Sequence, residues 1–464
     1  MKSKNSVTVV ILAAGKGTRM QSDLPKVLHA VGGKPLVWHV VQQAAFLQPQ
    51  KICVVVPQDS VAIQKALGAE SKIHFATQNQ QLGTGDAVRA ATTVLKTSSG
   101  CVVVLNGDMP LLKPETLQAL VQQFRRDKAQ VLLTTLVAGP TSDFGRIERD
   151  AEGQLLRIVE VRDATPAQKQ IPEVNVGVYI FDAAFLQKNI RKLKTNNAQK
   201  EYYLTDIVGL AVQQKQKVTS YTLSNSQEAL GVNSQKDLNL ANTYFYEGQR
   251  HSFMSQGVVM LGQEVFIDAG VQLARGVRLE SPCYLKGLTC IGENTLIETG
   301  VVMHNSLVGD HAQIKAHSYL NQAIVGPQCE VGPFAHLRPG TDLARQVKVG
   351  NFVEIKKSTL GVGSKANHLA YLGDATIGKG VNVGAGTITC NYDGENKFKT
   401  VLEDGVFIGS DTQLVAPVTV GEGAFVAAGS TITKNVSAFA LALSRTQQVE
   451  RPNWAKKRQT TKNR

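Results

Sequence analysis

The chain has 464 residues, 43% of them hydrophobic and 19% charged, which is enough apolar material for two or three domains and too little charge for a disordered protein. The net charge is +13, and residues 451–464 carry six Lys and Arg and no acid. The longest early apolar run, residues 7–14, is too short for a membrane span and leads to no cleavage site, so we expect a cytoplasmic protein. Six cysteines without a CxxC pair favour reduced, mostly buried thiols over a disulfide framework or a zinc site.

The first half of the chain alternates short apolar runs with amphipathic stretches. Residues 7–12, 52–56 and 101–105 predict buried parallel strands, and residues 35–48 and 114–125 predict helices between them. This order is typical of a doubly wound, Rossmann-like α/β domain, whose ligands bind beyond the carboxyl ends of the strands.

We assign residues 1–235 to this domain and residues 236–256, which have a polar helical pattern, to a linker helix. From residue 257 the period changes, because an aliphatic residue recurs at every sixth position in three runs. The repeated residues are Ile267, Leu273, Leu279, Leu285, Ile291, Ile297 and Met303, then Val325, Val331, Leu337, Leu343, Val349 and Ile355, then Leu402, Ile408, Leu414, Val420, Val426 and Ile432. Such a period predicts a parallel β-helix, at roughly 18 residues per coil, over residues 257–464.

Residues 391–399 interrupt the six-residue rhythm. The repeat has no place for them within a coil, so they predict a loop that projects from the β-helix. Insertions of this kind tend to lie on the functional face of a repeat domain.

A Gly-rich segment, Leu12-Ala-Ala-Gly-Lys-Gly-Thr-Arg-Met20, follows the first predicted strand. Gly15 and Gly17 would allow a phosphate to approach the backbone closely. The Walker pattern does not fit, because Val10 stands where it requires Gly. The dinucleotide fingerprint does not fit either, because Met20 stands in place of its third Gly.

Together with Leu24-Pro-Lys-Val-Leu28, this segment resembles the signature of sugar-1-phosphate nucleotidylyltransferases. Further matching motifs are Gln81-Leu-Gly-Thr-Gly85, Asn106-Gly-Asp108, Phe144-Gly-Arg-Ile147, Ile158-Val-Glu160, Asn175-Val-Gly177 and Gly231-Val-Asn233. With the hexapeptide half, nearly the whole chain resembles the bacterial family of bifunctional N-acetylglucosamine-1-phosphate uridylyltransferases and glucosamine-1-phosphate acetyltransferases. The resemblance implies a left-handed β-helix, a homotrimer, Mg²⁺ as cofactor, and acetyl-CoA and UTP as co-substrates.

The resemblance implies a first site that joins UTP to N-acetylglucosamine-1-phosphate. Lys26 and Arg19 would meet the triphosphate, while Asp108 and Asn233 would hold Mg²⁺ through side-chain oxygens, which are hard ligands. The other residues implied to bind UDP-N-acetylglucosamine are Leu12, Ala13, Ala14, Gly15, Gln78, Gly83, Thr84, Asn106, Gly107, Gly145, Glu160 and Asn175. No general base is expected, because the attacking sugar-phosphate oxygen is already ionised.

A second site, for acetyl transfer from acetyl-CoA to glucosamine-1-phosphate, is implied on the β-helix. Because an ammonium has no lone pair, the amine needs a base, and we expect His368 as that base, with Asn391 stabilising the oxyanion. The residues implied for the sugar phosphate are Arg338, Lys356, Tyr371 and Asn382. Those implied for acetyl-CoA are Ala385, Asn391, Tyr392, Ser410, Ala428 and Arg445.

Two other interpretations stay open. The β-helix could be only structural or regulatory, attached to a single-activity nucleotidylyltransferase. The charge of +13 could also indicate a nucleic-acid-binding protein, although nearly half of it lies in the tail and we expect the rest to serve phosphorylated small molecules. We predict a cytoplasmic two-site enzyme of UDP-N-acetylglucosamine synthesis, feeding cell-wall glycan production, with small-molecule substrates and neither a specific nucleic acid nor a membrane span.

Overall fold

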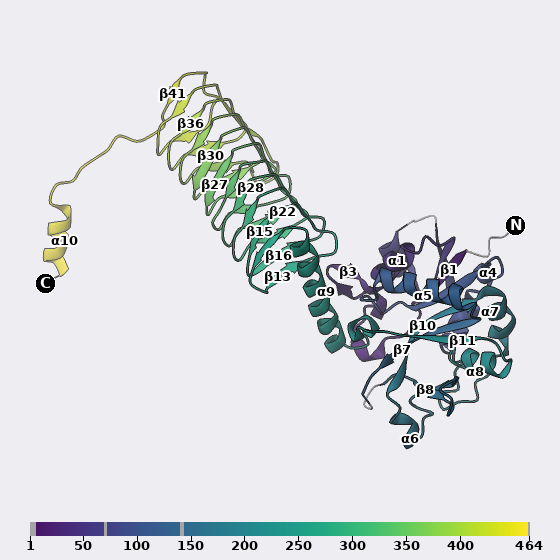
Figure 1. Cartoon of the computed structure of the whole chain (residues 1–464). Coiled ribbons are helices and arrows are strands. Elements are labelled where there is room, and N and C mark those ends of the chain that lie inside the picture. Colours follow the sequence, from purple (N-terminus) through teal and green to yellow (C-terminus); the bar gives the residue numbers. More distant parts are fainter. Residues whose placement is uncertain (1–5, 69–71, 140–142, 463–464) are drawn as a thin grey trace. The chain divides into compact units, whose positions relative to one another are not determined.

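The computed structural model describes residues 6–68, 72–139 and 143–462, and the chain forms two compact units, residues 1–247 and 248–464 (Figure 1). The division falls inside helix α9, Gln235–Ser255, which covers most of the segment expected as a linker. Among the described residues, no helix is long and apolar enough to cross a membrane.

The first unit is built on one central sheet with strand order β11-β7-β10-β6-β1-β4-β5. Its strands are β1 (Val7–Leu12), β4 (Lys51–Pro57), β5 (Ile73–Gln78), β6 (Cys101–Asn106), β7 (Val131–Val137), β10 (Glu173–Asp182) and β11 (Val218–Thr222). All pairs are parallel except those of β10, which is antiparallel to β6 and β7. A hairpin of β8 (Arg146–Arg149) and β9 (Leu155–Val159) attaches to β10. The three predicted strands are therefore confirmed as β1, β4 and β6.

Helices cover both faces of this sheet. They are α1 (Leu36–Ala45), α2 (Val61–Leu67), α3 (Thr84–Ala90), α4 (Thr92–Leu95), α5 (Pro114–Asp127), α7 (Ala183–Asn189) and α8 (Asp206–Gln213), whereas the short α6 (Pro166–Lys169) contacts β8 of the hairpin. Side chains of β1 alternate between two apolar clusters: Val9 packs with Leu117 of α5 on one face, and Val10 packs with Leu186 of α7 on the other. This burial on both sides explains the unbroken apolar runs and confirms the doubly wound α/β class.

The order of the sheet reverses at β1. Strand β4 lies on one side of it and β6 on the other, with Leu12 in register with both Val55 and Asn106. The chain continues from β1 to β4 on one side of this point and from β6 towards β7 on the other, so the space beyond the carboxyl ends of β1 and β6 is the topological switch point at which α/β proteins bind ligands.

The second unit is a parallel β-helix with three strands in each coil. Strands β12 (Val259–Leu261) to β41 (Leu441–Ala442) form three parallel sheets, in which nearly every strand pairs with the third strand after it. The strands used below are β27 (Lys348–Asn351), β28 (Glu354–Lys356), β30 (Lys365–His368), β31 (Tyr371–Gly373), β33 (Asn382–Val383), β34 (Ile388–Cys390) and β35 (Thr400–Leu402). A helix in the tail, α10, spans Trp454–Lys462. The β-helix predicted from the repeat is confirmed.

The recurring aliphatic residues form the interior of the coils. Ile297 and Met303, for example, are both fully buried, and so is Ile314, which lies between the first two runs. The coil that contains residues 391–399 is longer than the one before it, because Ala375 pairs with Thr400, whereas Thr359 pairs with Thr376. Tyr392 within this insertion is 59% exposed, so the segment projects from the coil as predicted.

The β-helix interior gives a matched test of these coils. Ile314→Ala should lower the free energy of unfolding by about 2–5 kcal/mol, because it leaves a cavity in a close-packed interior. Ile324→Ala, at a position 46% exposed, should change it by less than about 1 kcal/mol. Urea denaturation of the two variants followed by circular dichroism makes the comparison, and equal losses would contradict the assignment of inside and outside.

Candidate active sites

A cleft of about 480 Å³, which we call the first cleft, lies beyond the carboxyl ends of β1, β5 and β6. Predicted site residues that line it are Leu12, Ala14, Gly15, Arg19, Lys26, Gln78, Gly83, Thr84, Asn106, Asp108 and Asn233. They come from segments spread over the whole first unit, so the fold assembles most of the implied nucleotide site in one place.

The Gly-rich segment needs a glycine at position 17. Gly17 has φ +62°, and a Cβ on it would lie 2.6 Å from the Cβ of Lys26. The chain therefore turns here without a side chain and passes close to Lys26, which brings the loop and this lysine into the same wall of the cleft.

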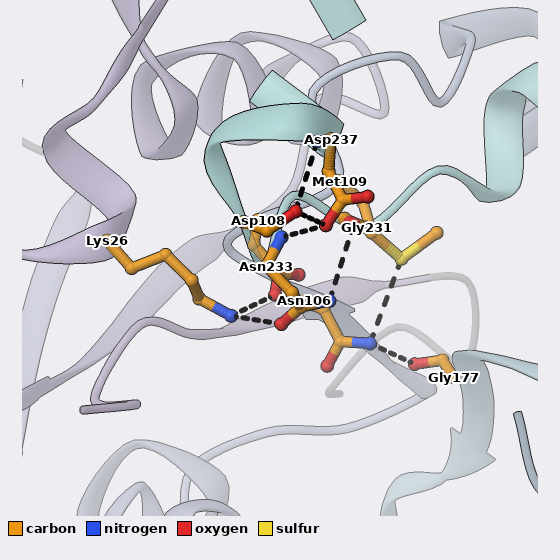
Figure 2. A network of polar contacts seen from close by, with 9 residues as sticks. Lys26, Asn106, Asp108, Met109, Gly177, Gly231, Asn233 and Asp237 are labelled. Atoms are coloured by element: carbon orange, nitrogen blue, oxygen red, sulfur yellow. Dashed lines mark hydrogen bonds and ion pairs between the residues drawn. The ribbon is translucent and has the colours of Figure 1, made fainter. Parts of the chain in front are cut away.

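Lys26 lies at the centre of a polar network (Figure 2). Its ammonium forms an ion pair with Asp108 Oδ2 and donates a hydrogen bond to Asn233 Oδ1 at 3.0 Å. Asp108 follows β6 and Asn233 stands just before α9, so the contact joins distant parts of the unit. The side chains of Lys26 and Asp108 are only 13% and 17% exposed, which limits screening by water.

These two oxygens fit a divalent metal. Asp108 and Asn233 both direct an oxygen at one cationic atom, the Lys26 nitrogen, which is the convergence that a bound cation requires. A carboxylate and an amide oxygen are hard ligands, and Mg²⁺ commonly takes one or two such protein oxygens together with substrate phosphates.

Two glutamines supply acceptors to the first cleft. The Gln78 amide nitrogen donates to Gly83 O at 3.2 Å and to Asp86 Oδ2 at 2.8 Å. Since both of these bonds use the nitrogen, the side-chain oxygen of Gln78 is the atom that a ligand would contact. The Gln81 nitrogen donates to Ala14 O at 2.6 Å, and its buried oxygen has no hydrogen-bond partner within the described ranges. Both oxygens would accept from a ligand N–H or O–H.

The residues expected to hold the sugar form a second group. Asn175 N donates to Gly145 O at 2.8 Å, and a Cβ on Gly145 would lie 3.5 Å from Glu160 Oε2. The Gly177 backbone connects this group to the first cleft, because it donates to Asn175 Oδ1 at 3.2 Å and accepts from Asn106 Nδ2 at 3.3 Å. Glu160 also lines a separate cleft of about 510 Å³ and accepts from Thr205 Oγ1 at 3.0 Å.

Two predicted residues lie behind the cleft wall instead of in it. Ala13 is buried and donates its N–H to Val55 O at 2.8 Å, and Gly107 donates to Leu12 O at 2.9 Å. Five cleft residues received no role from the sequence: Thr18, Val27, Gln81, Ala87 and Glu201. The first three lie inside quoted motifs, whereas nothing local in the sequence pointed to Glu201.

In the β-helix, several implied residues of the acetyl-transfer site form a column along one corner. Successive coils are joined there by Gly386 N to Leu369 O at 2.9 Å, Asp411 N to Ala385 O at 2.7 Å, and Gly429 N to Ser410 O at 2.8 Å. Ala385, Ser410 and Ala428 therefore occupy equivalent corners of three coils, and Leu369, the residue after His368, occupies the same corner of the coil before them. Arg445 reaches the same column, since a Cβ on Gly429 would lie 3.6 Å from its Cδ.

His368 is exposed and contacts Asn351 of the preceding coil. Its Nδ1 lies 3.0 Å from Asn351 Oδ1, and the two residues are in register in β30 and β27. Because the amide oxygen can only accept, the histidine donates from Nδ1 and keeps the lone pair on Nε2. Sequence reasoning gave Asn351 no role; the signal that could have found it is its spacing of one coil from His368.

Three cations gather where a sugar phosphate is expected. Nearby Lys397, followed by Arg338, lowers the pKa of Lys356, as expected for like charges close together. Arg338 also pairs with Glu354 at 2.7 Å. Lys397 belongs to the projecting loop, and its role was missed because the loop has no repeat position that would place it beside Lys356.

The other implied residues of this site are more dispersed. The Asn391 amide donates to Asp374 Oδ2 at 2.5 Å, which fixes its orientation, but no hydrogen bond within the described part of the chain joins it to His368. Tyr392 donates to Gly394 O inside the projecting loop. Asn382 lies in β33 beside Lys365 and Phe407, in a different sheet from Tyr371 of β31.

Three family models match the chain. Nucleotidyl transferase matches residues 8–236, the GMPPB C-terminal domain matches residues 280–359, and bacterial transferase hexapeptide (six repeats) matches residues 399–434. Similar curated proteins carry the name Bifunctional protein GlmU. The one from Trichlorobacter lovleyi is 44% identical over 97% of this chain and 98% of its own length, and the one from Alcanivorax borkumensis is 46% identical with the same coverage. The similarity thus spans both units.

The carboxyl groups of Glu160 and Glu148 should affect the melting temperature in opposite directions, because their pKa values are shifted in opposite directions. Burial raises the pKa of Glu160, so its charged form destabilises the fold above that pKa, and Glu160→Gln should raise the melting temperature at pH 7.5. The gain should shrink as pH falls through the raised pKa. Arg157 lowers the pKa of Glu148, so Glu148→Gln should lower the melting temperature at pH 7.5. Thermal melts between pH 4.5 and 7.5 measure both, and shifts of one sign would contradict this electrostatic account.

Proposed function

The chain belongs to the GlmU family of bifunctional proteins, and from this premise we propose how its residues divide the two reactions. It is an enzyme that transfers acetyl from acetyl-CoA to glucosamine-1-phosphate and then uridylyl from UTP to N-acetylglucosamine-1-phosphate. The second step releases pyrophosphate and forms UDP-N-acetylglucosamine, a precursor for the cell wall.

For uridylyl transfer, the observation that carries our assignment is the convergence of Asp108 and Asn233 on one cation (Figure 2). Nucleotidyl transferases of this family generally use a divalent metal, and we assign Mg²⁺ to these two oxygens. When bound, the ion would neutralise phosphate charge. Lys26 and Arg19 add further positive charge in the first cleft.

The chemistry of the first site consists mainly of positioning anions. An ionised oxygen of the sugar phosphate attacks the α-phosphorus of UTP, a new P–O bond forms, and the bond to the leaving pyrophosphate breaks. The acceptor oxygens of Gln78 and Gln81 suit uracil, which carries an N–H at N3 where cytosine carries a lone pair. Gly145 and Glu160, together with Asn175 of β10, would hold the amino sugar.

For acetyl transfer, we assign the base to Nε2 of His368, since its Nδ1 is engaged with Asn351. The amine attacks the thioester carbonyl, its proton passes to Nε2, the C–N bond forms, and the C–S bond breaks to release CoA. Asn391 would face the developing oxyanion, and Lys356 and Arg338, together with Lys397, would bind the sugar phosphate. Acetyl-CoA would lie along the corner column of Ala385, Ser410, Ala428 and Arg445.

We also propose a homotrimer in the cytoplasm, where UTP and acetyl-CoA are available. Asn382 and Tyr371 are implied for the same amino sugar and yet lie in different sheets of one chain. A neighbouring subunit that contributes one of these residues would resolve this separation, which supports an assembly with sites between chains.

Asp108→Ala tests the first site. Loss of a hard oxygen ligand should reduce Mg²⁺-dependent pyrophosphate release by at least about a hundredfold, because charge neutralisation is the main catalytic contribution. Release of CoA in the presence of glucosamine-1-phosphate should stay at the wild-type rate and serves as the control for folding of the second unit. Retained pyrophosphate release would refute the metal assignment.

His368→Ala tests the second site in the same assay. CoA release should fall by about 10²–10⁴-fold, the usual contribution of a general base, while pyrophosphate release from UTP and N-acetylglucosamine-1-phosphate stays unchanged. Asn351→Ala should reduce CoA release less than His368→Ala does. It removes the acceptor that keeps the proton on Nδ1 of His368, but the base itself remains. Wild-type CoA release by His368→Ala would rule out His368 as the base.

A further inference from the structure

Asp237, in the first turn of α9, is in direct contact with the proposed metal ligand Asn233. Its Oδ2 accepts a hydrogen bond from Asn233 N at 3.1 Å and another from Ser234 Oγ at 2.8 Å. Asp237 N donates back to Ser234 Oγ at 3.2 Å, which closes a reciprocal bond at the start of the helix. Figure 2 shows Asp237 on the side of Asn233 away from Lys26.

Both polar atoms of the Asn233 side-chain amide form hydrogen bonds. Its side-chain nitrogen donates to Gly231 O at 3.3 Å, and its oxygen accepts from Lys26 at 3.0 Å. The next backbone N–H upstream, that of Val232, donates to Asp108 O at 2.9 Å. Asp237 holds the backbone of Asn233 in place. It therefore also fixes where the side chain of Asn233 starts, and with it the position of the amide oxygen relative to the cation.

The helix that carries Asp237 is itself anchored to the segment around Lys26. Gln235 Nε2 donates to Met20 O at 3.1 Å, and Asn242 Oδ1 accepts from Gly32 N at 3.0 Å. Gly32 has φ +52°, and a Cβ on it would lie 2.0 Å from the ring of Phe245, so the helix and the segment are in close contact. The start of α9 is thus a rigid support for the ligand.

We propose that Asp237 is a positioning residue that orients Asn233 for the metal of the first site. It is not among the residues that line the first cleft, so its effect would reach the metal through Asn233. The proposal rests on the proposed function, because it takes Asn233 as a metal ligand. It makes the first turn of the linker helix a working part of the uridylyl-transfer site.

The test measures metal binding directly in the full-length chain. Mn²⁺ is titrated in the presence of UDP-N-acetylglucosamine, and the EPR signal of the free ion reports binding. Asp237→Ala should weaken Mn²⁺ binding about tenfold, the usual loss when a ligand's outer partner is removed. It should raise the Mg²⁺ concentration for half-maximal pyrophosphate release by a similar factor, while kcat at saturating Mg²⁺ stays within about twofold.

A further pair of variants separates positioning from other roles. Asp237→Asn keeps an acceptor oxygen at the same distance and should bind Mn²⁺ nearly as the wild type, whereas the longer Asp237→Gln should not. If Asp237→Asn and Asp237→Gln bind Mn²⁺ equally weakly, the effect of Asp237 depends on its charge and not on the position of its oxygen, and the proposal is overturned. This pair decides the matter even if Asp237→Ala fails to fold.

Ser234→Ala is the control for helix capping, because it breaks the reciprocal bond but leaves the bond from Asn233 to Asp237. It should lower the melting temperature and leave Mn²⁺ binding within about twofold of wild type, since a cap contributes to helix stability alone. A loss equal to that of Asp237→Ala would overturn the proposal. Asp108→Ala completes the set: wild-type Mn²⁺ binding by that variant would refute the metal site itself, a failure distinct from that of Asp237.

Discussion

The shared contact of Lys26 with Asp108 and Asn233 is the interaction on which the first unit's site depends. It joins residues separated by 82 and 207 positions along the chain, in a place where water screens charge weakly. Each partner is held by its own element: Asp108 follows β6, Asn233 precedes α9, and Lys26 begins a short 3-10 helix packed against the Gly-rich turn. The sheet order matters because it brings the ends of β1 and β6 together, which lets these segments meet.

The second unit obeys a different constraint, the near-constant length of a coil. Since each strand pairs with its counterpart one coil later, residues spaced by one coil share a face or a corner. This rule places His368 directly over Asn351 and extends the column to Ala385 and Ser410. The one long insertion escapes the rule, and it is the segment that brings Lys397 to the cations of the preceding coils.

The two sites also deal differently with charge. The first collects cations and acceptor oxygens, since its reactants are anions that must approach one another. The second needs a neutral amine, so an exposed histidine with one nitrogen engaged is suited to it, and in our proposal its cations would only hold the phosphate. On this proposal, part of the chain's excess positive charge would face anionic substrates, and six of its Lys and Arg residues lie in the tail.

The sequence by itself determined the classes of both units, because buried parallel strands and coil interiors leave apolar patterns with their own periods, as in β1 and at Ile314. Its motifs also pointed to Lys26, Asp108, Asn233 and His368. Only the tertiary structure decided which residues support them: Asp237 behind Asn233, Asn351 beside His368, Asp374 on Asn391, and Ala13 behind the cleft wall. The physical reason is that a hydrogen bond between side chains depends on the distance and direction of atoms, which no local pattern records, whereas burial repeats with the geometry of the element and is written directly into the sequence.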